Sequence, residues 1–410
     1  MTEHRRHKTT SPYYFLRVVI LAGLVFSMLP DNTALAAKAA PSDMSVIQEL
    51  SLFNPEAMER AIKYLSARHP KRFNEAKLLA ELKSHTTQFK AILSAPKKRR
   101  QNAKLSPNAK AIIDFKRRVL LANPILDFDQ ILTAQRKGPG TASNWLVNTS
   151  VRKNGWDAAI GTVSLKGEFT PLAKSTNFMG DMNLHFDAGK AIFSSIAKNG
   201  TWQVFELNIK DKSIRQVSSS KHSDIHNFDP CYLPDEKIIY VSTSGFQGVP
   251  CIGGGGDIAN LHVMNKDGTG IRRLAFDQES NWNPYLMENG RIMYQRWEYT
   301  DLSHFWSRIL FTMNPDGTDQ RAYYGSNSWW PNSLFYAKSV PGESNAFTAV
   351  VSGHHGAKRS GQLILFDVAK GRNDDKGVLQ TIPGHGKPFK SIVTDQYFGG
   401  KWPKFLHPYP

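Results

Sequence analysis

Three long segments in the second half of the chain hold most of the side chains that could do chemistry. Segment 244–258 contains Cys251, four consecutive glycines and Asp257. Segments 299–306 and 353–360 together contain three histidines, one aspartate and one arginine. Imidazole and carboxylate groups can ligate a metal ion or transfer a proton, so these segments are candidates for a binding or catalytic site.

The strand expected at 292–298 leads directly into the second of these segments. Alternation along an extended chain places Arg296 and Glu298 on the same side of that strand. We therefore predict a ligand-binding site here. Its candidate residues are Arg296, Glu298, Tyr299, Asp301, His304, His354, His355 and Arg359. Two alternatives remain open: an Arg296–Glu298 pair that only joins two sheets, and a Glu298–Asp301 carboxylate pair that cleaves a glycosidic bond.

A divalent metal ion is a further possibility. Its possible ligands are His222, His226, His354 and Asp257. No close spacing enforces such a site, and the adjacent His354 and His355 point to opposite sides of an extended chain. The alternative is a rim of loop residues that bond to one another.

Cys231 and Cys251 are the only cysteines. Their number fits one disulfide in an oxidising compartment. Cys231 is expected to open the first strand of its repeat and Cys251 to lie in a loop that returns to the same face, so we expect them to pair; two free thiols are the alternative. Neither belongs to a Cys-x-x-Cys-His motif, and the sequence therefore predicts no covalently bound haem. No other cofactor is indicated with certainty.

The elements that position these segments are short β-rich runs, which follow one another from about residue 125 to 410. Similar tripeptides recur along them: Phe228-Asp229-Pro230, Trp282-Asn283-Pro284, Trp329-Trp330-Pro331 and Lys401-Trp402-Pro403. Asn-Gly and Asp-Gly pairs mark hairpin turns within each repeat. We predict a mainly β fold, a β-propeller with about five recognisable four-stranded blades. The tryptophans at 282, 297, 329, 330 and 402 are expected to pack between blades.

In a propeller, the loop between the second and third strands of a blade lies on the same face as the connection to the next blade. All three chemistry-bearing segments are therefore expected on one face, here called the long-loop face. The opposite face is expected to hold only short turns such as Pro234-Asp235 and Asn289-Gly290. Because a new repeat starts near Lys401, the array is expected to be truncated in this chain or to close in an unusual way.

Residues 37–124 are predicted to be helical, with a basic linker. Apolar residues recur at helical spacing, as at Met58, Ile62 and Leu65, and a further helix is expected over 107–121. Asn54-Pro55-Glu56 provides an N-cap, a first-turn proline and a first-turn acid.

The first 36 residues are typical of a secretory signal peptide. Arg5 and Arg6 precede an apolar run over 15–29 and the small residues of Ala34-Leu35-Ala36. The run is shorter than the ~20 residues that span a bilayer, so we expect cleavage after Ala36. The mature protein is then expected in the periplasm or outside the cell, without a transmembrane segment.

The formal net charge of +17 does not by itself indicate nucleic-acid binding. Much of the excess lies in the signal and in residues 97–118, where a solvated linker or attraction to an anionic envelope surface accounts for it. We expect no nucleic-acid partner. An envelope protein or a small ligand at the long-loop face is the expected partner.

Several stretches resemble proteins that carry the middle domain of the hydrazine synthase alpha subunit. They are residues 227–235, 246–251, 296–301, 308–317, 324–327, 352–356 and 402–410. The resemblance implies a TolB-like propeller in the envelope, and relatives that continue beyond the last stretch. It does not imply hydrazine synthesis, because the haem motifs are missing.

The sequence therefore predicts an exported, noncatalytic binding or scaffold propeller. Two alternatives stay open: a propeller hydrolase or lyase with its site on the long-loop face, and a docking subunit for a separate redox partner that carries haem.

Overall fold

The computed structural model describes residues 46–47, 49–96, 102–165, 167–299, 308–382, 395–401 and 403–410. The expected signal peptide, Asp301, His304, Trp402 and the side chain of Cys251 lie outside this description. The described residues divide into two units, one that ends at Asp127 and one that starts at Phe128. Each unit is described by itself.

The first unit is helical, as the apolar spacing predicts. Its main helices are α2 (Pro55–Arg68), α3 (Glu75–Ser94) and α5 (Pro107–Leu121). The Asn54 side chain accepts a hydrogen bond from the Ala57 amide at 3.1 Å and so caps α2 as expected. Apolar side chains from all three helices form one core, which includes Ile62, Leu65, Leu82, Ile112 and Phe115. Among the described residues, no helix is both long and apolar enough to cross a membrane.

The second unit is built from antiparallel β-sheets that follow one another along the chain. The first has three strands: β1 (Gln130–Lys137), β2 (Asn154–Ser164) and β3 (Phe169–Asn177). The second has four: β4 (Gly180–Leu184), β5 (Lys190–Ile196), β6 (Trp202–Asn208) and β7 (Ile214–Gln216). The third also has four: β8 (Asn227–Tyr232), β9 (Ile238–Ser242), β10 (Asn260–Met264) and β11 (Arg272–Arg273).

The remaining strands form two further four-strand meanders. One contains β12 (Asn281–Leu286), β13 (Ile292–Trp297), β14 (Arg308–Met313) and β15 (Arg321–Tyr324). The other contains β16 (Ser333–Ser339), β17 (Ala346–Ser352), β18 (Gln362–Asp367) and β19 (Val378–Ile382). A single parallel pair, Arg308 with Ser333, joins the two meanders into one eight-stranded sheet.

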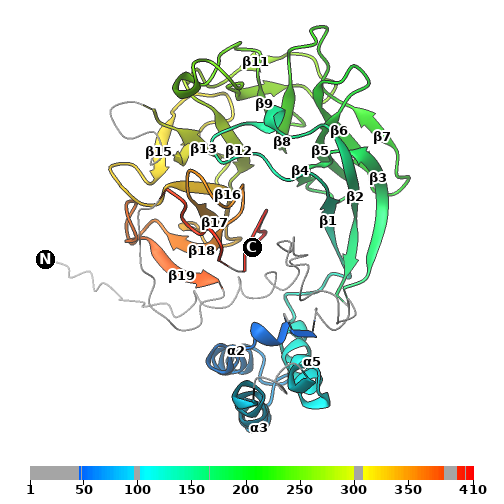
Figure 1. The fold of residues 1–410 in the computed structure, drawn as a ribbon, viewed down its shortest axis with the longest axis vertical. Helices are drawn as coiled ribbons and strands as arrows, with labels where there is room; N and C mark the ends of the chain where they lie inside the picture. Colours follow the sequence, from blue (N-terminus) through cyan, green and yellow to red (C-terminus); the bar gives the residue numbers. More distant parts are fainter. Residues whose placement is uncertain are drawn as a thin grey trace, which may run out of the picture. The chain divides into compact units, whose positions relative to one another are not determined.

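The sheets surround a common centre, and β4, β8, β12 and β16 are the innermost strands (Figure 1). The end of the chain lies inside this ring. The arrangement is propeller-like, so the predicted mainly β fold with a small helical region is confirmed, whereas the predicted number of blades is not.

Each innermost strand bends at one residue that is not glycine but has a positive φ. These residues are Asp181, Asp229, Asn283 and Tyr336, which are 48, 54 and 53 residues apart. The pairing of each strand with its neighbour shifts at this residue, as in a β-bulge. The bulge, rather than the proline beside it, is the feature that repeats from sheet to sheet.

Two of the tripeptides used to find the repeat lie inside innermost strands, a third lies just before one, and the fourth opens no strand among the described residues. Trp330 and Pro331 precede β16, whose bulge is at Tyr336. Near Lys401, the described residues form only one isolated bridge, between Gly361 and Phe405, and no strand of a new sheet.

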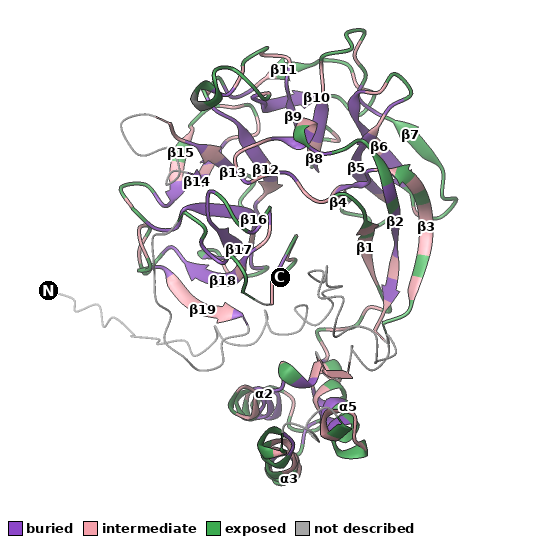
Figure 2. Ribbon diagram, in the orientation of Figure 1, coloured by how far each residue is buried: buried purple, intermediate pink, exposed green. Residues whose placement is uncertain are grey.

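Buried side chains concentrate in the inner and middle strands, whereas β1 and β3 are more exposed (Figure 2). Trp282, Trp297 and Trp330 are each at most 2% exposed and pack in the core as predicted. Trp329 is 66% exposed, so its predicted place between blades is wrong.

Candidate functional site

The long-loop face groups the ends of strands that the sequence predicted to lie together. Successive strands of each sheet run in opposite directions, so alternate connections lie at the same end of the sheet. The strand ends joined by 243–259, 298–307 and 353–361 therefore lie at the end where the chain also passes from one sheet to the next. Most turns at the opposite end are short, as expected, but the connection between β18 and β19, residues 368–377, is long.

Arg296 and Glu298 lie on the same side of their strand and form an ion pair, with Nε 2.6 Å from Oε1. Arg296 also pairs with Asp277 at 3.0 Å and lies over the ring of Phe311. Burial raises the pKa of Glu298, and the charge of Arg296 counteracts this rise. These two predicted ligand residues therefore satisfy each other. Tyr299 follows them with its ring against Trp297.

His354 and His355 do not diverge as predicted: the chain bends here instead of running extended, and the two rings meet edge to face with their centroids 4.3 Å apart. His354 is 3% exposed; its Nδ1 contacts the guanidinium of Arg308, and its ring stacks on Trp145 at 6.0 Å. His355 is exposed, and its Nδ1 lies 2.9 Å from the carboxylate of Asp395. Only His354 faces the interior of the long-loop face.

Glu279 is a residue of this face that the sequence analysis missed. It precedes β12 and is 1% exposed, and neither of its carboxylate oxygens has a hydrogen-bond partner among the described residues. Burial raises its pKa to about 7, although the positive charge of Arg308 acts in the opposite direction. Nothing in its local sequence distinguishes it from an exposed loop acid.

The possible metal ligands do not come together. Nδ1 of His226 accepts a hydrogen bond from the Trp202 amide at 3.1 Å, and His222 is exposed. Asp257 lies beside the Gly248 bridge, while His354 is occupied by Arg308. Across the described part of the chain, no three His, Cys, Asp or Glu side chains form a group that could hold a metal ion.

The expected disulfide is not formed. Cys231 is a free thiol, 1% exposed, and burial raises its pKa to about 11. It is the fifth residue of β8, where it pairs with Ile239, whereas the loop with Cys251 leaves β9 after Ser242, at the other end of the sheet. The error arose because Cys231 was placed at the start of its strand.

Arg359 has a different role from the one predicted. It is 4% exposed and donates from its side chain to the carbonyls of Ser143 and Leu146. The amide of Asn144 in turn donates to the carbonyls of Gly353 (2.7 Å) and Ala357 (3.0 Å). These bonds fasten the segment between β1 and β2 to the loop between β17 and β18, and so connect the first sheet to the last.

The centre of the propeller holds a second group of polar residues, here called the axial cluster. It consists of Arg136, Asp181, Asp229, Asn283, Tyr336, Lys338, Arg359 and His407. Most of these side chains are only half-buried although they lie on the innermost strands or inside the ring, so solvent reaches them. Only Arg359 was among the predicted site residues.

Amide groups, not cations, satisfy the carboxylates of the axial cluster. The backbone and side-chain N–H groups of Asn283 donate to Asp229 at 2.5 and 3.0 Å, and Asn283 accepts from the Tyr336 amide at 3.2 Å. Asn148 donates to Asp181 at 2.6 Å. Burial and the neighbouring Asp181 raise the pKa of Asp229 to about 7. The acid is therefore divided between its protonated and ionised forms near neutral pH.

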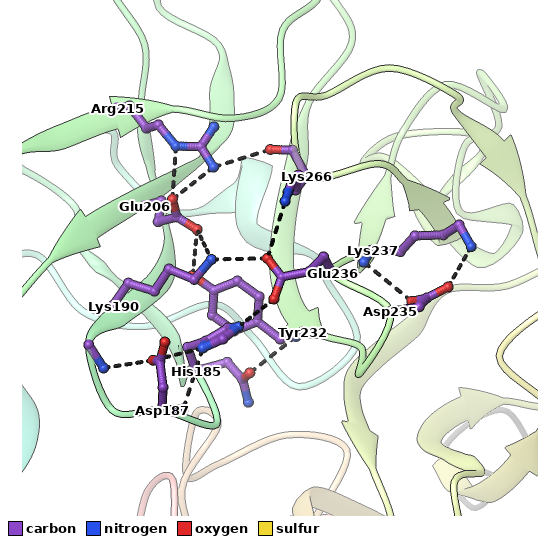
Figure 3. Close-up of polar contacts among 12 residues, drawn as sticks. His185, Asp187, Lys190, Glu206, Arg215, Tyr232, Asp235, Glu236, Lys237 and Lys266 are labelled. Atoms are coloured by element: carbon purple, nitrogen blue, oxygen red, sulfur yellow. Dashed lines mark hydrogen bonds and ion pairs between the residues drawn. The ribbon is translucent and has the colours of Figure 1, made fainter.

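A contrasting polar group, the inter-sheet ion network, joins the second and third sheets (Figure 3). Its residues are His185, Asp187, Lys190, Glu206, Arg215, Tyr232, Glu236 and Lys266. Glu206 accepts from the Tyr232 hydroxyl at 2.8 Å and pairs with Arg215 at 2.7 Å. Glu236 pairs with His185 at 3.1 Å and Lys190 at 3.3 Å. Opposite charges lie next to each other throughout this network.

Comparison with known proteins supports the fold and goes no further. No family model and no curated protein matches the chain. Kuenenia stuttgartiensis hydrazine synthase matches 61% of this chain and 38% of its own, with 17% identity and a TM-score of 0.49. TolB from Acinetobacter baumannii matches 52% and 46%, with 12% identity and a TM-score of 0.37. The β-propeller domain of the trilobed protease from Pyrococcus furiosus matches 58% and 66%, with 8% identity and a TM-score of 0.33.

The chain thus spans less than half the length of the hydrazine synthase and TolB chains. The sheets themselves, and not these partial matches, are the basis for describing the fold as propeller-like. The matches carry no argument about activity.

Proposed function

We propose that this chain is a noncatalytic binding propeller that docks a partner protein through its long-loop face. The observation that carries the proposal is a pair of exposed aromatic side chains, Phe246 and Phe276, which are 66% and 76% exposed on two loops that Arg273 links; this pair is here called the patch. Large exposed aromatic side chains that lie together on a soluble protein mark interaction surfaces.

Arg273 holds the two loops of this patch together. Its guanidinium lies 4.9 Å from the ring centre of Phe276 and donates to Gln247, the neighbour of Phe246, at 3.2 Å. A further bond to Asn260, at 2.7 Å, anchors it to β10. The patch is therefore preorganised, which lowers the entropy cost of docking.

The reactive residues of the same face favour binding over catalysis. Arg296 pairs with Glu298, and His354 contacts Arg308, so these side chains are already engaged. Glu279 favours the hydrolase or lyase alternative, since its pKa of about 7 suits proton transfer. At 1% exposure, however, it is out of reach of a substrate.

We further propose that the protein is exported and that it is a relative of the hydrazine synthase alpha middle-domain proteins with about five blades. The basic and apolar N-terminal sequence supports export, and the ordered motifs support the relationship. Intact-mass analysis of protein from the envelope should give a mature terminus at Ala37; an unprocessed Met1 would contradict export.

The docking proposal can be tested by site-specific photo-crosslinking in cells. A crosslinking residue at Phe276 should give a defined protein adduct, and Phe246→Ser in the same chain should reduce it about tenfold, as expected for the loss of a buried aromatic anchor. A crosslinker at Phe186, which is 61% exposed on a turn of the opposite end, is the matched control. Equal adducts from both positions, or none from either, would refute the proposal. A haem-containing adduct would identify the partner as the redox protein of the alternative hypothesis.

A further inference from the structure

Three cations of the axial cluster are held by neutral groups. Arg136 donates to the Met179 carbonyl at 3.0 Å, and Lys338 lies over the rings of Tyr285 and Tyr409 at 4.6 and 5.4 Å. Arg359 donates to backbone carbonyls, as described above. None of the three forms an ion pair among the described residues, in contrast to the cations of the inter-sheet ion network.

The fold makes room for these cations at the axis. A side chain at Gly180 would place its Cβ 2.0 Å from a guanidinium nitrogen of Arg136, so glycine is required for Arg136 to reach this position. The guanidinium of Arg359 lies 5.0 Å from the ring of Phe335 and 5.4 Å from that of Trp282. Rigid aromatic and backbone supports thus preorganise the positive charges.

His407 brings the three cations into one site. Its ring lies 3.9 Å from that of Tyr336, which precedes Lys338 by two residues on β16. Burial and the charges of Arg136, Lys338 and Arg359 keep the pKa of His407 well below its usual range. The imidazole is therefore neutral, and it adds a hydrogen-bonding group without adding charge.

Backbone strain is concentrated at the same place. Among the described residues, fourteen other than glycine have a positive φ, and six of these belong to the axial cluster: Asp181, Asp229, Asn283, Tyr336, Arg359 and His407. Such conformations cost about 1–3 kcal/mol each and persist where the surrounding structure enforces them, often at ligand sites.

We propose that the axial cluster binds one small dianionic oxyanion, sulfate or a phosphate group, through Arg136, Lys338 and Arg359. Asp181 and Asp229 attract these cations electrostatically, but amides hold both carboxylates and neither forms a direct ion pair with a cation of the cluster among the described residues. Guanidinium groups present the planar pairs of donors that suit oxyanions. This site is independent of the docking patch on the long-loop face.

Isothermal titration with sodium sulfate, at an ionic strength held constant with chloride, tests the proposal. Saturable binding of about one sulfate per chain is expected, weakened about tenfold or more by Arg136→Gln and by Lys338→Met. Arg321→Gln is the matched control, because Arg321 is exposed on β15 and pairs with Asp319. Unfolding transitions of each variant establish that it is folded. Parallel titrations with inorganic phosphate and glycerol phosphate distinguish a free anion from a phosphate ester.

Sulfate keeps its charge across neutral pH, so it also reports the state of Asp229. Binding should be tighter at about pH 6 than at about pH 8, because protonation of Asp229 removes a negative charge from the site. Asp229→Asn should abolish this difference. The absence of saturable binding, or equal binding by wild type and both cation variants, would overturn the proposal.

Discussion

Lys190 and Lys338 illustrate two ways in which this propeller places a cation on a tyrosine ring. Lys190 lies over Tyr232 at 5.6 Å and also pairs with Glu206 and Glu236. Lys338 lies over Tyr285 at 4.6 Å, without a carboxylate partner among the described residues, and desolvation lowers its pKa. The first arrangement stabilises the contact between two sheets. The second leaves a positive charge available to a ligand.

The largest expected effect comes from breaking the inter-sheet ion network. Glu206→Ala removes the acceptor of the Tyr232 hydroxyl and the partner of Arg215, and should destabilise the protein by about 2 kcal/mol. Chemical denaturation measures this loss. Asp235→Ala is the control, since its pair with Lys237 is exposed and should contribute less than about 0.5 kcal/mol. Equal losses in the two variants would mean that the network contributes no special stability.

Asp229→Asn should stabilise the protein instead of destabilising it, and the size of this effect should depend on pH. The folded-state pKa of Asp229 is raised to about 7, so its contribution to stability is complete below its unfolded pKa and is lost as the pH rises through 7. The variant should therefore be more stable than wild type at about pH 8, and nearly equal to it at about pH 4. Thermal unfolding across this range measures the difference; parallel curves would contradict the assignment.

Asp187 is the counterpart of Asp229 within the ion network. The amide of Gly189 and then His185 lower its pKa, so its stabilising effect is present at neutral pH and lost on acidification. Asp187→Asn should lower the melting temperature at neutral pH and leave the pH dependence between about 4 and about 7 unchanged. A change of slope in that range would contradict this account.

A smaller effect is expected at Cys231. In the folded protein, burial and its raised pKa should protect it from maleimide, and unfolding without reductant should expose it to labelling. Mass spectrometry of the labelled peptide gives the result. Labelling of Cys231 in the folded state, or a need for reductant before it can be labelled, would contradict its assignment as a buried free thiol.

Local sequence was sufficient for much of the fold. Helix α5 begins at Pro107 and ends at Leu121, as predicted, and four-stranded meanders follow one another as the repeated β-rich runs predict. The pair of Arg296 and Glu298 was also foreseen from strand alternation. These features depend on neighbours in sequence.

The axial cluster could not be predicted in this way, because it depends on distant residues. Arg136 and His407 lie in the first and last described parts of the β unit and meet only when the ring forms. The bulges at Asp229 and Asn283 could have been recognised in the sequence, because Asp and Asn favour a positive φ. The bulge at Tyr336 could not, because it has neither residue type. The error at Cys231 has a similar origin, because a shift in the assumed start of β8 moves a residue to the other end of the sheet.

The central distinction is between Lys338, whose charge is available to a ligand, and Lys190, whose charge is paired with carboxylates. The effect of sulfate on the stability of Lys338→Met and Lys190→Met tests it most directly. Melting temperatures would be measured for both variants and wild type in sulfate and in chloride of equal ionic strength. At sulfate about ten times its Kd, wild type and Lys190→Met should gain about 3 °C, even though Lys190→Met starts from a lower value. Lys338→Met should gain much less. Equal gains in the two variants would show that the unpaired charge at the axis binds no anion, and would contradict the account.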